Sequence, residues 1–347
     1  MIYLSDLLEP TPSPLWHLVR QAGVDGIVTF LDGGEQQDRW MASVGGSNAA
    51  QEQGTAGRRL DRTSAPWSSA GIKALVHVYA ECGLRILAIE DTPPMEAIRM
   101  GLPGKEDELS HLHEQIRAMG EAGIGVLCYN WMPVSSWART RSDVPTRGGA
   151  VTTAFRLSDA ERQLLLPEAG RISADQLWSA LDDFLDSTLP VAEQAGVKLA
   201  LHPDDPPVPA LRGLPRIVNS VQAYRRILRD HPSPSNCITF CQGNWRLMTD
   251  DLPATISEFL PHIAFVHFRD VVGDVTDFVE AFQDDGPTDM AECMRRYVRG
   301  GFDGPMRPDH VPTMYGEAND HPGYATLGRL FALGYARGLI DATAGRQ

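Results

Sequence analysis

The stretch VKLALHPDDPP, residues 197–207, has the pattern of a buried strand that ends abruptly in polar side chains. The apolar run stops at His202, and two aspartates enclosed by prolines follow it. Proline restricts its own backbone and that of the residue before it, so the chain is kept extended beyond the strand. A histidine placed there indicates a binding or catalytic site if other strands of the chain end in the same way.

Similar apolar runs, rich in β-branched residues, recur along the whole chain and alternate with helix-like stretches. Eight strands are predicted, within residues 2–4, 25–31, 84–91, 123–130, 197–203, 236–243, 263–270 and 304–310. The clearest helices are predicted at 71–83, 106–123, 174–196 and 221–230. Three of these stretches are expected to end at a glycine, namely Gly83, Gly123 and Gly196.

This alternation predicts the fold class. Near-continuous apolar strands separated by helices are typical of a parallel sheet that is buried on both faces. Eight such units favour a closed (β/α)8 TIM barrel, with an open doubly wound sheet as the alternative. The barrel is preferred because no glycine-rich GxGxxG turn follows any strand, and because polar residues gather at many strand ends instead of at one point.

The chain of 347 residues is interpreted as one domain, residues 1–347, with two long insertions. Both insertions, at about 33–70 and 141–173, are polar and follow a predicted strand. In a barrel they therefore belong to the face at which the strands end, and we expect structureless loops that act as a lid or a mobile segment.

The amino-acid composition limits the kinds of binding partner that we expect for the chain, and the cellular compartment in which we expect it. A formal net charge of −14 argues against nucleic acid or an anionic membrane surface as partner. No apolar run approaches the roughly 20 residues of a membrane span, and no signal peptide is visible. The five cysteines form no CxxC pair, which favours a reducing cytoplasm over a disulfide framework.

Four of the predicted strands end in side chains of the types that bind metals, namely His202, Cys241, His267 and Asp309. The carboxyl ends of barrel strands converge on one mouth, so these four side chains are expected to meet. Nitrogen, sulfur and oxygen donors together suit Mn, Fe, Co or Zn, whereas Ca²⁺ and Mg²⁺ prefer oxygen alone. Each residue alone has an ordinary structural explanation, such as a buried thiol or a helix cap. Their occurrence on four strand ends favours a metal site.

Further polar residues are expected at the same mouth. Tyr324, His310 and Asp205 are candidate general acids or bases, and arginines there suit a substrate carboxylate. Asp204 and Asp205 could also orient the metal ligands through hydrogen bonds. The predicted catalytic residues are Tyr324, His310, Arg307 and Asp205, and the predicted substrate-binding residues are Asn130, Arg269, Glu90 and Asp204. Asp91 and Tyr129 also end strands, where they could instead hold loops or belong to the core.

Several segments together resemble the mannonate dehydratases of the UxuA type, which are xylose-isomerase-like TIM barrels. They are CYNWMPV (128–134), VKLALHPDDPP (197–207), LRGLPRIV (211–218), FCQGN (240–244), FVHFRD (265–270), MRPDH (306–310) and PGYATLGRLFALGYARGLI (322–340). The resemblance implies dehydration of D-mannonate to 2-keto-3-deoxy-D-gluconate with Mn²⁺ or Fe²⁺, Co²⁺ being possible. It implies that His202, Cys241, His267 and Asp309 are the metal ligands. It also implies that Tyr324, Arg307 and His310 are catalytic, with Arg307 holding the carboxylate.

The substrate rim departs from the family pattern, which leaves other functions open. The family's HHIP-like motif is replaced by FLDGGE (30–35), and its ESVP by EDTPP (90–94). An isomerase, an epimerase or a dehydratase of another sugar acid on the same metal platform is therefore an alternative. A barrel that only binds a ligand is a third, although Tyr324, Arg307 and His310 argue against it. Relatives often form dimers, so a homo-oligomer is possible.

Overall fold

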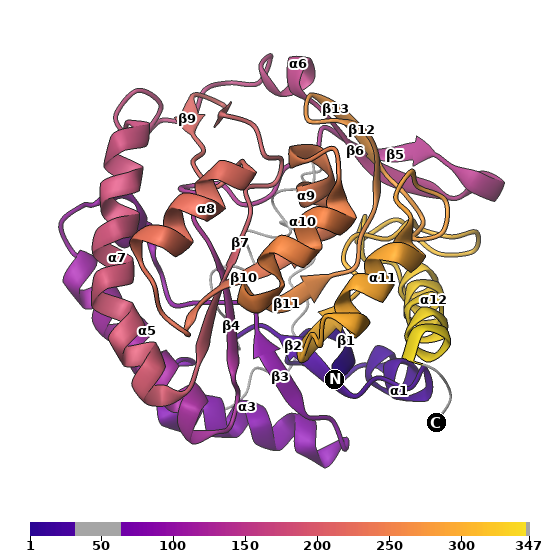
Figure 1. Ribbon diagram of the computed structural model, residues 1–347, viewed down its shortest axis with the longest axis horizontal. Helices are drawn as coiled ribbons and strands as arrows, with labels where there is room; N and C mark the ends of the chain where they lie inside the picture. The colour runs from indigo at the N-terminus through magenta and orange to yellow at the C-terminus, as the bar shows by residue number, and fades with distance from the viewer. Residues whose placement is uncertain (32–63, 345–347) are drawn as a thin grey trace.

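A closed barrel of eight parallel strands forms the centre of the computed structural model, which describes residues 1–31 and 64–344 (Figure 1). In spatial order the strands are β1 (Ile2–Leu8), β14 (Gly304–Arg307), β11 (Ile263–His267), β10 (Asn236–Cys241), β7 (Lys198–His202), β4 (Val126–Asn130), β3 (Ile86–Ile89) and β2 (Gly26–Thr29). Strand β1 pairs in parallel with both β2 and β14, which closes the ring and excludes the open sheet. Seven of the predicted strands each contain one barrel strand, and the eighth, 2–4, covers only the first part of the longer β1, so the TIM-barrel prediction is confirmed.

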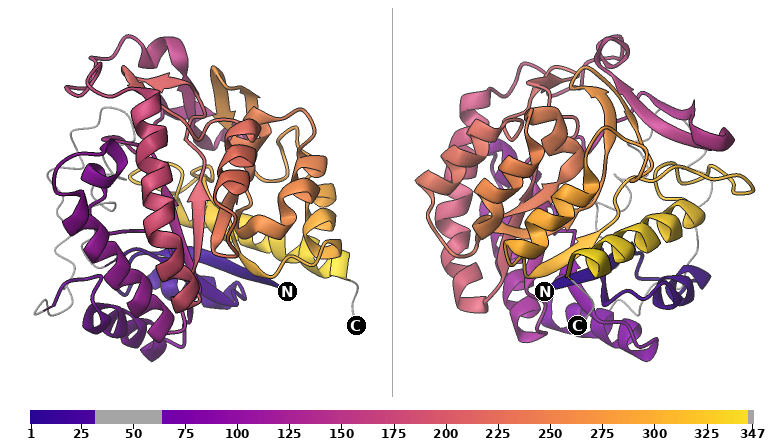
Figure 2. Two further views of the ribbon diagram at one scale, coloured as in Figure 1. Left: turned by 60° about the vertical axis from the view of Figure 1, so that its left-hand side comes forward. Right: turned by 45° about the vertical axis from the view of Figure 1, so that its right-hand side comes forward.

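Helices surround the barrel on its outer side (Figure 2). They are α1 (Pro14–Gln21), α3 (Ser69–Glu81), α4 (Glu96–Met100), α5 (Lys105–Glu121), α7 (Ala174–Ala195), α8 (Val221–Asp230), α9 (Gln242–Met248), α10 (Leu252–Phe259), α11 (Met290–Arg299) and α12 (Thr326–Ala344), with the 3-10 turn η3 (Leu260–His262) after α10. None of the helices among the described residues is long and apolar enough to cross a membrane.

Local sequence explains where the longest of these helices begins and ends. The hydroxyl of Ser173 accepts from the backbone N–H of Gln176, whose side chain accepts in return from the backbone N–H of Ser173, so α7 starts with a capping box. It ends at Gly196, whose φ of 68° is a left-handed conformation that favours glycine. The four predicted helices are found as α3, α5, α7 and α8, with closely similar bounds.

A second, antiparallel sheet lies over the mouth of the barrel, at the end away from the N-terminus (Figures 1 and 2). Its strand order is β12 (Val271–Asp274), β13 (Asp277–Glu280), β6 (Val151–Arg156) and β5 (Arg141–Pro145). The turn η2 (Arg147–Gly149) joins β5 to β6, and the short helix α6 (Leu157–Ala160) follows. The strands β8 (Ala210–Leu211) and β9 (Leu214–Pro215) form a separate hairpin beside this region.

The expectation of a structureless loop at 141–173 is therefore wrong for its first half. Strand β6 pairs with β13, where Phe155 lies opposite Phe278, and both rings are fully buried. The partner strand comes from the distant loop that follows β11, so no local pattern revealed the pairing. The other predicted insertion, 33–70, falls mostly on residues 32–63, which lie outside the described residues.

The barrel interior is packed with side chains and is not an open channel. Leu7, Val28, Phe265 and other side chains of the strands form one buried cluster there, while a larger cluster joins the strands to the outer helices. All five cysteines are free thiols. Space for a ligand is consequently found where the strands end, at the carboxyl-terminal face of the barrel.

Candidate active site

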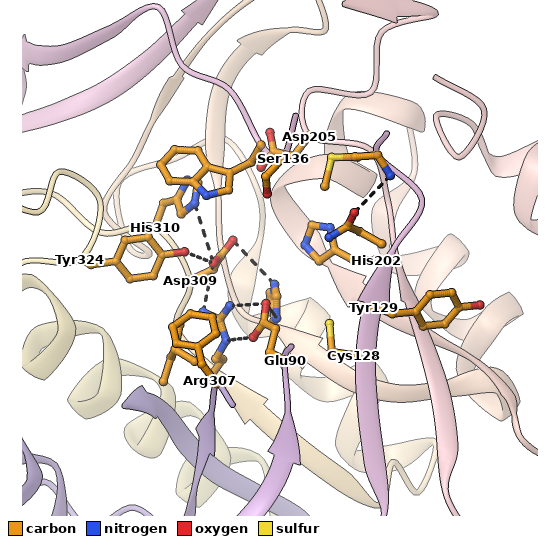
Figure 3. A pocket seen from close by; sticks show the side chains of 16 residues that line it. Glu90, Cys128, Tyr129, Ser136, His202, Asp205, Arg307, Asp309, His310 and Tyr324 are labelled. Carbon is orange, nitrogen blue, oxygen red and sulfur yellow. Dashed lines mark hydrogen bonds and ion pairs between the residues drawn. The ribbon is translucent and has the colours of Figure 1, made fainter. Parts of the chain in front are cut away.

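A pocket opens at the carboxyl ends of the barrel strands, beneath the small sheet (Figure 3). Its lining residues are Leu7, Phe30, Glu90, Cys128, Tyr129, Asn130, Met132, Ser136, Trp137, His202, Asp205, His267, Arg307, Asp309, His310 and Tyr324. Asp309 lies near the centre, with Tyr324 and His310 on one side and His202 on the other (Figure 3). Most of the residues predicted from strand ends therefore meet in one place.

Three of the predicted metal ligands, His202, His267 and Asp309, line this pocket, and the fourth, Cys241, is fully buried close to them. The donor atoms of His202, Cys241 and His267, at the ends of the adjacent strands β7, β10 and β11, all lie within 4.8 Å of one another. Asp309 follows β14, and its Oδ2 lies 3.6 Å from Cys241 Sγ and 3.7 Å from His267 Nδ1. Two imidazoles, a thiol and a carboxylate are thus close enough to share one small ion.

The hydrogen bonds of these side chains fit a divalent transition ion. His202 Nδ1 lies 2.7 Å from the carbonyl oxygen of Pro203, so Nδ1–H donates and Nε2 is left as a donor atom for a metal. His267 is buried, and no described residue lies within hydrogen-bond geometry of either ring nitrogen; the nearest carboxylate oxygens, of Glu90 and Asp309, lie at 3.5 and 3.7 Å. A buried polar atom without a partner is unfavourable, and metal coordination would remove that cost. The mixed nitrogen, sulfur and oxygen donors also match such an ion.

A second group of potential ligands, Glu90, Cys128 and His267, also lies within 4.8 Å, but Glu90 and Cys128 already interact with other side chains. Arg307 donates to both oxygens of Glu90, at 3.0 and 2.9 Å. Burial raises the pKa of the Cys128 thiol well above its ordinary value, and its sulfur lies 3.1 Å from the Thr239 hydroxyl. The group that contains His202 and Cys241 therefore has the better donor set.

Arg307 links the carboxylates on two sides of the pocket. Besides Glu90, its Nη1 donates to Asp309 Oδ1 at 3.0 Å and to the carbonyl oxygen of Pro308 at 2.8 Å. Burial alone would raise the pKa of Glu90, but the charges of Arg307 and His267 outweigh it and lower that pKa to about 2. The guanidinium predicted to bind a substrate carboxylate is thus already paired with two carboxylates of the protein.

Two candidate proton-transfer groups, Tyr324 and His310, lie side by side on one side of the pocket. The hydroxyl of Tyr324 donates to Asp309 Oδ1 at 3.1 Å. The ring of His310 packs edge-on against Tyr324, with 5.3 Å between ring centroids, and 4.6 Å from the ring of Trp137. Both groups line the pocket, close to the oxygen and nitrogen atoms that could hold a metal.

Behind His310 lies a buried ionic network of two arginines and two carboxylates. Arg139 binds both oxygens of Asp205, at 2.7 and 3.0 Å, and Glu280 Oε1 at 2.6 Å. Arg269 binds Asp205 Oδ2 at 3.0 Å and both oxygens of Glu280, at 2.8 and 2.7 Å. Burial opposes ionisation of Asp205, but Arg139 and Arg269 hold the pKa of its carboxyl well below the usual range. The carboxyl group of Asp205 is therefore ionised, and Arg139 and Arg269 hold it in place.

Arg139 and Glu280 were not predicted from the sequence. Arg139 follows the CYNWMPV segment, in a polar loop without strand or helix periodicity. Glu280 ends β13 of the small sheet, and nothing in the sequence placed that strand over the barrel. The only available signal was the position of Arg139 shortly after a strand that leads into the mouth.

Two predicted substrate-binding residues do not line the pocket. Arg269 is fully buried behind Cys241, with Nη1 donating to Cys241 Sγ at 3.3 Å and to Asn244 Oδ1. Asp204 is also fully buried and accepts from the backbone N–H of Val218 at 2.8 Å. Burial raises the pKa of Asp204 to about 6, against the opposing charge of Arg216.

The remaining predicted residues divide between the pocket and the core. Asn130 lines the pocket, and its side-chain oxygen accepts from the backbone N–H of Met132 at 3.1 Å. Tyr129 also contributes to the lining, although it is mostly buried among core side chains. Asp91 is fully buried and accepts from the backbone N–H of Leu31 at 3.0 Å, which is a loop-holding role.

The chain is similar in sequence to D-mannonate dehydratases. The family model described as D-mannonate dehydratase (UxuA) matches residues 13–166 and 160–347. A mannonate dehydratase from Streptococcus equi subsp. zooepidemicus is 32% identical over 304 residues, which cover 80% of this chain and 83% of that protein. A mannonate dehydratase from Oceanobacillus iheyensis is 31% identical over 301 residues, covering 79% and 86% of the two chains.

Solved structures agree with this likeness. The crystal structure of mannonate dehydratase from Streptococcus suis superposes with a TM-score of 0.84 at 30% identity, covering 99% of this chain and 93% of that one. A 3-keto-D-glucoside 4-epimerase from E. coli, at 13% identity and a TM-score of 0.59, shares the fold alone. The extent of the family match and the identity to its members over most of both chains place this chain in the D-mannonate dehydratase (UxuA) family.

Proposed function

We propose that this chain dehydrates D-mannonate to 2-keto-3-deoxy-D-gluconate, with Mn²⁺ or Fe²⁺ held by His202, Cys241, His267 and Asp309. The observation that carries the proposal is the meeting of these donors with His310 and Tyr324 in one pocket of a chain that belongs to this family. An ion bound there would polarise the substrate oxygens and stabilise the negative charge that develops as C2 loses its proton.

The chain's own side chains supply the proton transfers. One of His310 and Tyr324 accepts the C2 proton, and the electron pair of that bond forms the C2–C3 double bond. The other donates a proton to the hydroxyl leaving C3, which departs as water, and the resulting enol converts to the 2-keto acid. Each residue lies close to Asp309, so both could reach a substrate bound beside the metal ligands.

The substrate carboxylate is expected to bind near Arg307. Among the described residues that line the pocket, Arg307 is the only arginine. Its contacts with Glu90 and Asp309 fix the position of the guanidinium. A substrate carboxylate would have to bind Arg307 in addition to these two carboxylates. The role of Arg307 in substrate binding stays a prediction.

The test is a substrate panel on protein purified without oxygen and reloaded with Mn²⁺. Anaerobic handling matters because an Fe²⁺ site with a cysteine ligand would be sensitive to oxygen. D-mannonate and other aldonates and uronates are incubated with the protein, and mass spectrometry records loss of one water. We expect turnover of D-mannonate, and a fall of about 10²–10⁴-fold in Tyr324→Phe, which loses the hydroxyl that donates to Asp309.

Other outcomes would replace the proposal. Water loss from a different acid, with none from D-mannonate, would keep the dehydratase chemistry and change the substrate. A product of unchanged mass from a sugar acid would favour the isomerase or epimerase alternative. No turnover, together with no uptake of Mn²⁺, would favour a barrel that only binds a ligand.

A further inference from the structure

We propose that Glu280 is a positioning residue that fixes the tautomer of His310, with hydrogen on Nδ1 and a bare Nε2 facing the pocket. His310 Nδ1 lies 3.0 Å from Glu280 Oε1 and 2.9 Å from Arg139 Nη2. One neighbour can accept a hydrogen bond and the other can donate one, so the distances alone do not choose the tautomer. The inference depends on the proposed function only for the use that is made of Nε2.

Counting the hydrogens of Arg139 resolves the choice. A guanidinium has five N–H groups. Nε donates to Glu280 Oε1 at 3.0 Å, and Nη1 donates to the carbonyl oxygen of Ala138 at 2.8 Å and to Asp205 Oδ1 at 2.7 Å. Nη2 donates to Asp205 Oδ2 at 3.0 Å and to Glu280 Oε1 at 2.6 Å. All five hydrogens have carboxylate or carbonyl acceptors, so none remains for His310 Nδ1.

Glu280 is then the partner of the histidine. An ionised carboxylate only accepts hydrogen bonds, so the hydrogen between the two residues belongs to His310 Nδ1. The ion pairs with Arg139 and Arg269 keep Glu280 ionised although it is fully buried. In neutral His310 the lone pair is consequently on Nε2, which lies 3.9 Å from Asp309 Oδ1.

This tautomer separates the two proton-transfer roles. A bare Nε2 can accept the C2 proton, and the imidazolium that forms is stabilised by Glu280 behind it. Tyr324 already holds its proton toward Asp309 and is the group left to protonate the departing hydroxyl. The catalytic groups are thus His310 and Tyr324, and Glu280 acts through His310.

The small sheet delivers Glu280 to this position. Glu280 ends β13 and lies opposite Val271 of β12. Arg139 is held between the rings of Trp137 and Phe278, which lie 5.2 and 5.0 Å from its guanidinium carbon. The sheet over the mouth therefore holds the histidine from behind and is a part of the active site.

The tautomer can be measured directly, without reference to turnover. Two-bond proton–nitrogen correlation spectra are recorded on the full chain with isotope-labelled histidine and Zn²⁺, which is diamagnetic, in the metal site. His310→Gln identifies the signals of His310 by their disappearance. We expect hydrogen on Nδ1 and the chemical shift of an unprotonated nitrogen for Nε2. Hydrogen on Nε2 with a bare Nδ1 would overturn the proposal.

A substitution tests the role of Glu280. In Glu280→Gln the amide can donate to Nδ1 and select the other tautomer, so we expect kcat for D-mannonate to fall about 10²–10⁴-fold. KM and metal content should change less than about threefold, because neither the metal ligands nor the pocket lining is altered. Asp277→Asn is the matched control: it removes the same charge from the same strand, where Asp277 forms an exposed ion pair with Arg156.

The possible outcomes distinguish the positioning role of Glu280 from the proposed dehydration of D-mannonate. An unchanged tautomer and wild-type kcat in a folded Glu280→Gln would refute the positioning role. If Glu280→Gln does not fold, the spectrum of the wild-type chain still shows which ring nitrogen of His310 carries the hydrogen. A wild-type chain that shows the expected tautomer but does not dehydrate D-mannonate would refute the proposed function and leave the hydrogen-bond assignment standing.

Discussion

Cys241 is the most enclosed of the proposed metal ligands. Its side chain is fully buried, with Asp309 Oδ2 at 3.6 Å and Arg269 Nη1 at 3.3 Å from the sulfur. The thiolate is the form that binds metals, and the nearby guanidinium supplies a positive charge beside it. Substitution of Cys241 therefore shows whether the ion binds to the group that contains Cys241 or to the group that contains Cys128.

We predict that Cys241→Ser weakens metal binding more than it weakens folding. Loss of a ligand should lower the affinity for Mn²⁺ by about 100-fold or more, since loss of a group that only orients ligands already costs about 10–100-fold. Cys128→Ser is the matched control, since Cys128 is a second buried thiol at this pocket and belongs to the other group. Metal titration measures affinity, and thermal unfolding of metal-free protein measures the fold. Equal metal binding in Cys241→Ser and the wild type would refute the assignment.

The proposed ligands could be picked out of the sequence because they lie at the ends of predicted strands. The direction of a parallel barrel strand determines where its last side chains lie, so His202, Cys241 and His267 could be placed together before the structure was known. Arg269 lies two residues beyond His267, outside the strand, and there the chain is free to turn the side chain behind the ligands. No feature of the sequence placed Glu280 near the site, because its position depends on the pairing of β13 with the distant strand β6.

At the scale of elements, the barrel and the small sheet differ in how far they could be predicted. Each barrel strand carries its own apolar run, and helices of recognisable pattern separate the runs. Strand β5, with the sequence RSDVP, is largely exposed and polar, so its conformation depends on pairing with β6. The small sheet is held by an apolar cluster of its own, which includes Phe155, Phe278 and Val271.

This separation predicts that the sheet can be loosened without unfolding the barrel. Phe278→Ala removes a fully buried ring that lies 5.7 Å from the ring of Phe155 and beside Arg139, and such a truncation costs about 3–5 kcal/mol. Hydrogen exchange should speed up in β5, β6, β12 and β13 and stay slow in the barrel strands. We expect kcat to fall while Mn²⁺ affinity changes little, because the proposed metal ligands lie at the ends of barrel strands or just beyond them.

Val272→Ala is the control for this experiment. Val272 lies on β12 of the same sheet, pairs with Val279 and is about half exposed, so its truncation should leave exchange and kcat near wild type. Faster exchange throughout the barrel in Phe278→Ala would show that the sheet and the barrel unfold as one unit, contrary to the prediction.

At the scale of the whole molecule, the two ends of the chain close the barrel together. Strand β1 fits between β2 and β14, with Ile2 opposite Gly304, and α12 packs against β1 (Figure 1). Arg329 of α12 reaches Asp6 of β1 at 3.0 Å and also donates to the carbonyl oxygen of Leu7, which lines the pocket. Both charged side chains are buried, so this ion pair joins barrel closure to the wall of the active site.

Arg329→Leu is therefore predicted to destabilise the whole fold. It leaves Asp6 buried without its counter-charge, which costs about 3–5 kcal/mol, measured as the free energy of unfolding in urea. Arg337→Leu, on the same helix, removes a partly exposed pair with Asp25 and should cost no more than about 1 kcal/mol. Adding Asp6→Asn to Arg329→Leu should recover much of the loss, because no unpaired charge remains and an amide oxygen can still accept from the backbone N–H of Leu7. A double variant no more stable than Arg329→Leu alone would mean that the contact with the Leu7 carbonyl, and not the ion pair, holds the last helix to the first strand.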